Sequence, residues 1–181
     1  MSVEFNAVMT RAVAVGDLLS AAGTILVELT GIDEAPPTVA VVGNERRLGR
    51  VVGAGQTLGP DRLATTWLGP GVPDPHLEIF DDAGTELAQL VVSAAPDAWI
   101  VTVSPGGPAR AIVSGLAFAC AAALLGDGQV VDNDLRLTDG YEHDIGGFVA
   151  ATRLPPGPRT LDGACLEYLH RFPQLEGWPP S

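Results

Sequence analysis

A chain of 181 residues is long enough for one compact domain, and 46% of its residues are hydrophobic, so intrinsic disorder and a disulfide-built miniprotein are excluded. The 22 acidic residues face 10 basic ones, all of them arginine, which gives a net charge of −12. This charge disfavours nucleic acid and anionic membranes as partners. The lack of lysine excludes Schiff-base catalysis and a Walker A phosphate site. We expect a single domain over residues 1–181.

The N-terminal third is expected to begin with a helix at 6–23, because apolar residues recur three or four apart and a glycine at position 23 would end it. Short β-rich runs then predict strands, each bounded by glycine, proline or aspartate. These runs are 24–30, 38–42, 47–52, 64–68 and 77–80. The glycine- and proline-rich stretch 52–76 is expected to be the longest irregular region, which is typical of a functional loop.

The centre of the chain carries the clearest local signal, Asp81-Asp82-Ala83-Gly84, which predicts a hairpin turn before an antiparallel strand at 86–92. A further strand at 99–103 continues a meander. Residues 111–126 then form a run of 16 uncharged residues. At about 1.5 Å per residue this run barely reaches the roughly 30 Å of a bilayer core, so a helix at 109–125 buried against the sheet is favoured over a membrane span.

The C-terminal part predicts one short strand at 129–132 and two more helices, at 145–152 and 162–172, with Glu167 able to pair with Arg171. The proline-rich connector 154–159 is expected to be stiff. The predicted fold class is therefore α+β. It consists of a mostly antiparallel sheet of six to eight strands, with the buried apolar helix on one face and N- and C-terminal helices flanking it.

Motifs for catalysis are not found in this sequence. The three histidines are scattered, and neither Ser104 nor Ser114 lies in a GxSxG nucleophile motif. The glycine-bearing stretches 43–49 and 53–59 lack the spacing or the lysine of a nucleotide site. Cys120 and Cys165 lie in apolar stretches and form no CxxC pair, so we expect buried free thiols. We expect no catalytic residue, no cofactor and no metal.

The most unusual stretch is rich in carboxylates and has a single arginine, Arg136. Its acidic residues are Asp127, Asp132, Asp134, Asp139, Glu142 and Asp144. The spacing does not match a calcium-binding loop, although a metal-dependent hydrolase site stays open. For any single residue, a solvated acidic loop is the simpler interpretation. As a group, the carboxylates suit rapid docking to a basic protein surface.

Three aromatic residues in irregular stretches are either tethers that hold a loop on the core or anchors for a partner. For Trp178 we favour the tether. For Trp67 and Tyr141 the two interpretations are balanced. The candidate partner-binding residues are therefore Asp127, Asp132, Asp134, Asp139, Tyr141, Glu142, Asp144 and Trp67.

The arginine-only, alanine- and glycine-rich composition is typical of actinobacteria with GC-rich genomes. The order of a strand meander, the apolar helix 109–125, the stretch Gly126-Asp127-Gly128-Gln129-Val130-Val131-Asp132 and a terminal helix over 161–169 resembles small immunity proteins of polymorphic toxins. The resemblance covers the C-terminal half and has no invariant motif. It implies a protein that blocks the active site of a toxin.

The leading hypothesis is a non-enzymatic cytoplasmic inhibitor of one cognate secreted toxin. Carboxylates from the stretch 127–144 would meet the basic cleft of the toxin, and the stretch 53–71 would obstruct it. A cytoplasmic location fits the N-terminus, which carries Glu4 and no basic stretch before an apolar run. The alternatives are a secretion chaperone for an exported protein, which would be expected to dimerise, and a metal-dependent hydrolase. The oligomeric state is left open.

Overall fold

A seven-stranded antiparallel sheet organises the computed structural model, which describes residues 3–42, 46–47, 50–51, 55–69 and 76–175. The strand order is β11-β1-β10-β9-β8-β3-β6. The strands are β1 (Phe5–Met9), β3 (Thr38–Val42), β6 (Gln56–Thr57), β8 (His76–Asp81), β9 (Glu86–Ala95), β10 (Ala98–Pro105) and β11 (Gln129–Val131). Two small ladders pair β2 (Val13–Ala14) with β7 (Trp67–Leu68) and β4 (Arg46–Arg47) with β5 (Arg50–Val51). The predicted α+β class is confirmed.

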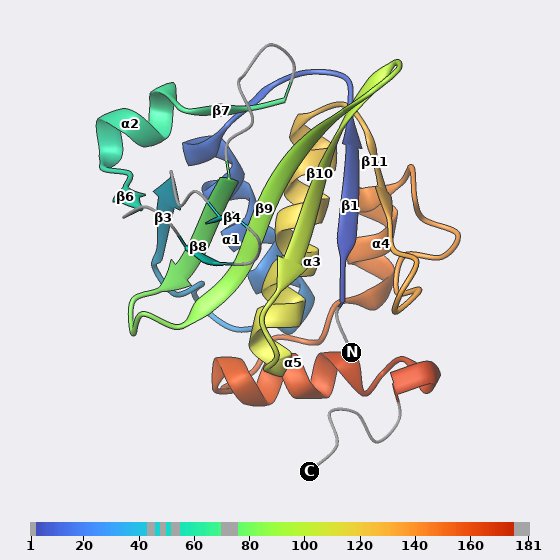
Figure 1. The fold of residues 1–181 in the computed structure, drawn as a ribbon. Coiled ribbons are helices and arrows are strands. Elements are labelled where there is room, and N and C mark those ends of the chain that lie inside the picture. Colours follow the sequence, from blue (N-terminus) through green and yellow to red (C-terminus); the bar gives the residue numbers. More distant parts are fainter. Residues whose placement is uncertain (1–2, 43–45, 48–49, 52–54, 70–75, 176–181) are drawn as a thin grey trace.

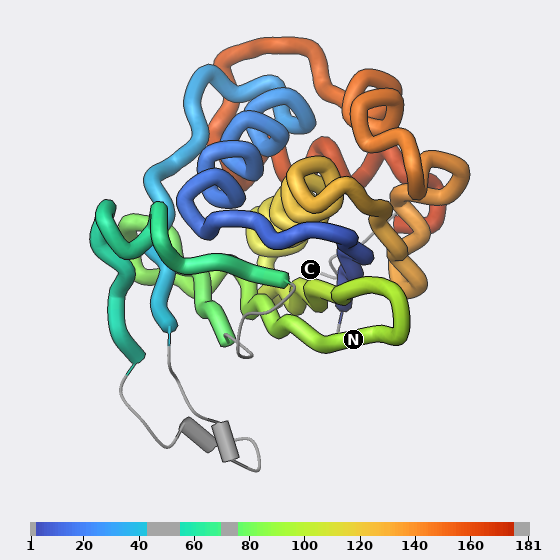
Figure 2. Tube along the Cα trace, turned by 90° about the horizontal axis from the view of Figure 1, so that it is seen from above, coloured from blue at the N-terminus to red at the C-terminus, as the bar shows by residue number. Residues whose placement is uncertain are grey.

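The helices α1, α3 and α4 lie on one face of this sheet (Figures 1 and 2). The helices are α1 (Val15–Thr30), α2 (Pro60–Thr65), α3 (Ala109–Leu125), α4 (Ile145–Thr152) and α5 (Leu161–Leu169), followed by a 3₁₀ turn at Pro173–Leu175. Helix α3 packs directly on the central strands, and α1, α4 and α5 pack against α3. Residues 111–123 of α3 are all buried, which explains why this helix is apolar all round rather than amphipathic. The predicted helix at 109–125 is confirmed.

The central meander β8-β9-β10 follows the predicted hairpin closely. Gly84 has φ 79° at the turn, and Asp81 accepts a hydrogen bond from the Thr85 amide at 2.7 Å. The Asp81 carboxylate is buried and pairs with Arg110 at 3.1 Å, which links the turn to the start of α3. Aspartate and glycine therefore occupy these turn positions for the expected reason, since both stabilise a tight reversal.

The prediction of a helix at 6–23 is wrong, and so is the strand at 24–30. Residues 5–9 form β1, whose alternating buried side chains Phe5, Ala7 and Met9 face α3 while the strand pairs with β10 on one side and β11 on the other. The helix instead runs from Val15 to Thr30. Pairing on both edges outweighs the local three-to-four spacing of the apolar residues, because a central strand satisfies every backbone group of the segment.

The irregular region expected at 52–76 is also corrected. Its described part contains β6, α2 and β7, and the run 64–68, expected as one strand, holds the end of α2 and the start of the β2–β7 ladder. Residues 52–54 and 70–75 lie outside the described residues, and so does Trp178. Helix α2 begins at Pro60, where the missing amide hydrogen costs nothing.

The C-terminal helix ends at Leu169, three residues before the predicted end. Glu167 pairs with Arg159 at 2.8 Å rather than with Arg171. Arg171 instead donates to the carbonyl oxygens of Thr152 and Arg153 at the C-terminal end of α4. A tertiary partner therefore replaces the expected partner on the same helix, because the carbonyl groups at a helix end lack internal partners.

The two cysteines are free and buried, as predicted. Burial, with a smaller contribution from Asp132, raises the pKa of the Cys120 thiol to about 12. Burial and the nearby Asp162 likewise raise the pKa of Cys165 to about 12. In the part of the chain that the structure describes, no helix combines the length and the apolar character needed to span a membrane.

Candidate functional site

The acidic segment, residues 127–144, starts where α3 ends. The Gly126 amide donates to the Ala122 carbonyl at 2.8 Å, and Asp127 then adopts φ 56°, which turns the chain back toward the sheet. At Gly128 a Cβ atom would lie 1.8 Å from the carbonyl oxygen of Val8, so this position requires glycine. The Asp127 side chain is exposed. The short turn thus places the first carboxylate of the segment at the end of β1.

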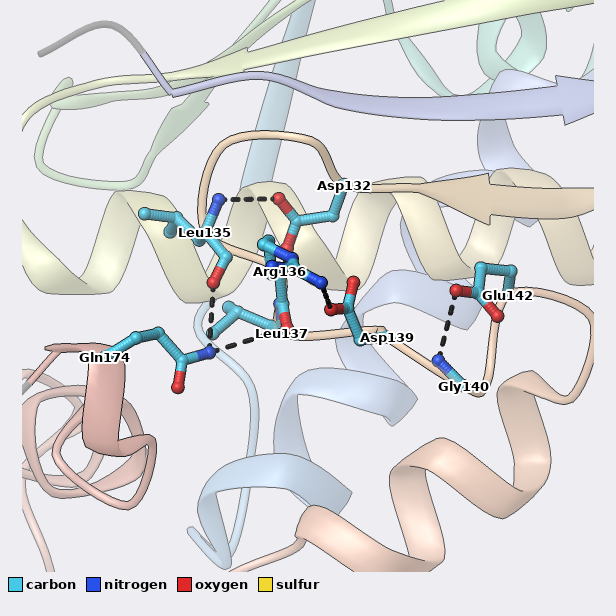
Figure 3. A network of polar contacts seen from close by, with 8 residues as sticks. All are labelled: Asp132, Leu135, Arg136, Leu137, Asp139, Gly140, Glu142 and Gln174. Carbon is cyan, nitrogen blue, oxygen red and sulfur yellow. Dashed lines mark hydrogen bonds and ion pairs between the residues drawn. The ribbon is translucent and has the colours of Figure 1, made fainter.

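The buried carboxylate of Asp132 fixes the backbone in the first half of the acidic segment (Figure 3). Its side chain is 5% exposed, and its two oxygens accept hydrogen bonds from the amides of Leu135 at 2.9 Å and Leu137 at 2.8 Å. Between these two buried leucines, Arg136 adopts φ 57°. The Gln174 amide group donates to the Leu135 carbonyl at 3.0 Å, which ties the loop to the C-terminal turn. Asp132, expected as a surface carboxylate, is therefore a structural residue.

Three other carboxylates accept backbone hydrogen bonds and stay at the surface. Asp134 accepts from the Glu4 amide at 2.8 Å, and Asp144 accepts from the Gly147 amide at 2.8 Å as the N-cap of α4. Glu142 accepts from the Gly140 amide at 3.1 Å. Hydrogen bonds from its own amide and from that of Gly140 hold the pKa of Glu142 below its ordinary value. All three side chains are fixed by the backbone around them.

Asp139 and Arg136 form an ion pair at 2.6 Å on the surface of the same loop. Both side chains are well exposed, so the pair contributes little to stability. Arg136, the one arginine of the segment, is therefore paired with a carboxylate of the same loop. Because the segment has six carboxylates and one arginine, its net charge is strongly negative.

Tyr141 lies beside the edge of the sheet. Its ring contacts that of Phe148 in α4, with centroids 6.1 Å apart, and 36% of the residue is exposed. The next residue, Glu142, accepts a backbone hydrogen bond from Val130 of β11 at 3.0 Å. The segment thereby covers the outer edge of β11, which protects that edge from pairing with another chain. Tyr141 therefore packs on α4, as a tether would, and keeps an exposed face.

Trp67 is not brought to the acidic segment. It stands on β7, which pairs with β2 and lies on the far side of β1 from β11 (Figures 1 and 2). Its side chain is 45% exposed. The structure therefore brings together the carboxylates and Tyr141 on one side of the molecule and leaves Trp67 apart from them.

The groups that could perform chemistry are dispersed. His76 Nε2 lies 3.8 Å from Glu78 Oε1 on β8, and the carboxylate of Glu78 is almost fully buried. Within the described residues, no group of three or more histidine, cysteine, aspartate or glutamate side chains is arranged to hold a metal ion. The arrangement that the structure does assemble is a fixed, negatively charged surface with one aromatic side chain.

Comparisons with protein-family models, with curated proteins and with solved structures gave no match to this chain.

Proposed function

We propose that this protein is a non-catalytic inhibitor that acts in the cytoplasm and blocks one cognate secreted toxin through the acidic segment. One observation carries the proposal: backbone hydrogen bonds fix the carboxylates of Asp134, Glu142 and Asp144, and these carboxylates stay at the surface. Asp127 and Asp139 add exposed negative charge beside them. Fixed charges of one sign attract a basic surface and orient it during docking.

The chemistry of the partner follows from this surface. A basic catalytic cleft would receive the carboxylates, and the half-exposed Tyr141 ring would supply an apolar contact near their centre. The choice of a toxin as the partner rests on the resemblance of the C-terminal half to immunity proteins. Asp132 is buried and Trp67 stands apart, so the proposed contact set contains neither.

The first experiment is co-expression with the protein encoded by the neighbouring gene, in a host that the neighbour harms. The expected result is restored growth, together with a complex that survives size-exclusion chromatography. A neighbour that is not toxic, or a toxic neighbour whose effect is unchanged, would overturn the proposed function.

The second experiment isolates the charge of the acidic segment. In the double variant Asp127→Asn with Asp139→Asn, neither changed side chain caps a backbone amide of the loop, and asparagine suits the left-handed backbone of position 127. The matched control, Asp61→Asn with Asp97→Asn, changes the net charge equally at exposed sites elsewhere. We expect the association rate at low salt to fall several-fold in the first variant and to stay near wild type in the control. Equal rates in both would refute charge steering.

A further inference from the structure

A second surface feature lies beside α1, and none of its lining residues belongs to the acidic segment. It is a hollow of about 660 Å³ between α1, the segment 33–38 and Leu63 of α2. This volume is within the range of peptide and small-molecule sites. Apolar walls are formed by Leu19, Val27, Ala35, Pro36 and Leu63.

The rim of this hollow is acidic. Glu28, Asp33 and Glu34 line it, and all three are exposed. Among the described residues that line the hollow there is no arginine or histidine, and none of these three carboxylates forms an ion pair within the described residues. The C-terminal end of α1 lies between Glu28 and Asp33 and adds partial negative charge. The hollow is therefore complementary to a cation.

An inner cavity of about 40 Å³ adjoins the hollow and shares Leu19, Gly23 and Ala35 with it. It reaches α3, where it is lined by Ser114. Ser114 is 2% exposed, and its hydroxyl has no hydrogen-bond partner within the described residues. Buried hydroxyl groups are nearly always paired, so this one is available to a polar group that enters the cavity. The cavity has room for the end of a short side chain.

We propose that this hollow binds a short basic peptide segment of a protein partner. Lysine or arginine side chains of the segment meet the rim carboxylates, and a threonine or serine between them enters the inner cavity and bonds to Ser114. The apolar walls and the inner cavity favour a peptide over a simple polyamine. A polyamine has no side chain that could enter the inner cavity. This site is separate from the acidic segment and does not depend on the partner being a toxin.

The probe is a labelled peptide of sequence lysine-arginine-threonine-lysine-arginine, measured by fluorescence polarisation with the full chain at low and high salt. We expect saturable binding that weakens as salt rises, and a loss of about tenfold when tryptophan replaces the central threonine. Absence of binding at low salt would overturn the proposal. Spermidine binding as tightly as the peptide would overturn the choice of a peptide.

Variants of the chain locate the site. Gly23→Ala places a Cβ atom 3.5 Å from that of Ala35, at the junction of the hollow and the inner cavity, and it also favours the helical conformation of α1. We expect a chain at least as stable as wild type that binds the peptide about tenfold more weakly. Unchanged affinity in this variant would contradict the assignment of the inner cavity.

The rim is tested by neutralising Glu28, Asp33 and Glu34 together as amides. The matched control also neutralises three carboxylates, Asp17→Asn with Asp61→Asn and Asp97→Asn, because all three are exposed and none lines the hollow. We expect the rim variant to lose about tenfold or more in affinity and the control to retain it. Equal effects in the two variants would mean that net charge, rather than this hollow, attracts the peptide. In the Ser114→Ala variant the inner cavity no longer presents a hydroxyl group. We therefore expect this variant to bind a peptide with valine in place of threonine as tightly as it binds the threonine peptide.

Discussion

Replacing Gly31 with alanine tests how the connector between α4 and α5 holds the end of α1. Gly31 follows α1 with φ 64°, and a Cβ atom there would lie 2.5 Å from the carbonyl oxygen of Pro155. The chains approach closely because the Leu154 amide donates to the Leu29 carbonyl at 2.9 Å and the Gly157 amide donates to the Gly31 carbonyl at 3.1 Å. Alanine must therefore push the connector away from the helix.

The expected loss in the free energy of unfolding has two parts. The left-handed backbone costs a residue with a Cβ atom about 1–2 kcal/mol. Displacing the connector breaks the two backbone hydrogen bonds, at about 1 kcal/mol each. We therefore expect Gly31→Ala to lose about 3–4 kcal/mol. Gly84→Ala is the matched control, because Gly84 has φ 79° but nothing within 4 Å of its added Cβ atom, so only the backbone cost of about 1–2 kcal/mol applies.

The assay is urea unfolding followed by far-ultraviolet circular dichroism for wild type and both variants. The m-values are expected to agree, so that the midpoints report stability directly. A loss in Gly31→Ala no greater than that in Gly84→Ala would refute the reasoning. It would mean that the connector moves aside freely and does not stabilise the end of α1.

Two further predictions concern the acidic segment. Asp132→Asn is expected to lose about 2–3 kcal/mol in the free energy of unfolding, measured in the same urea assay, because an amide offers one oxygen to two buried N–H donors. Asp134→Asn, which has one exposed contact, should lose less than about 1 kcal/mol. Equal losses in the two variants would contradict the structural role of Asp132. The pKa of Glu142 is lower in the folded chain than in the unfolded chain, so its stabilisation is present above the unfolded pKa and is lost as pH falls through the folded pKa. The stability difference between wild type and Glu142→Gln, measured by urea unfolding at several pH values, should therefore shrink as pH falls below the ordinary pKa of a glutamate, about 4.3. A difference that grew in acid would contradict the assignment.

The fold was predictable from sequence wherever local chemistry and tertiary structure agree. The turn Asp81-Asp82-Ala83-Gly84 and the apolar helix 109–125 are each specified by neighbouring residues, and the structure has both. The N-terminus was not predictable in this way. The apolar spacing that predicts a helix over 6–23 includes Val8, but the strand state of residues 5–9 is decided by pairing with β10 and β11, whose partner residues lie 90 or more positions away in sequence.

The acidic segment was found from composition, but the roles of its members were not. Asp132 and Asp134 look alike in the sequence, yet one is buried beneath two leucine amides and the other is exposed. The hollow beside α1 was missed altogether. Its signal was the stretch Asp33-Glu34-Ala35-Pro36-Pro37, which combines acids with rigid apolar residues, but the contribution of Ser114 depends on the packing of α1 on α3.

Under the proposed function, the carboxylates of the acidic segment would combine structural capping with partner binding, two roles that composition alone treats as alternatives. Six like charges within 18 residues repel one another, so the segment needs backbone hydrogen bonds to stay ordered. A carboxylate has about four acceptor positions, so the single backbone bond at Asp144 leaves the others available to a partner. The cost of ordering these side chains is met during folding and not again during binding. Neutralising Asp144 would change charge and order together, whereas neutralising Asp127 and Asp139 changes the charge while leaving these backbone caps in place.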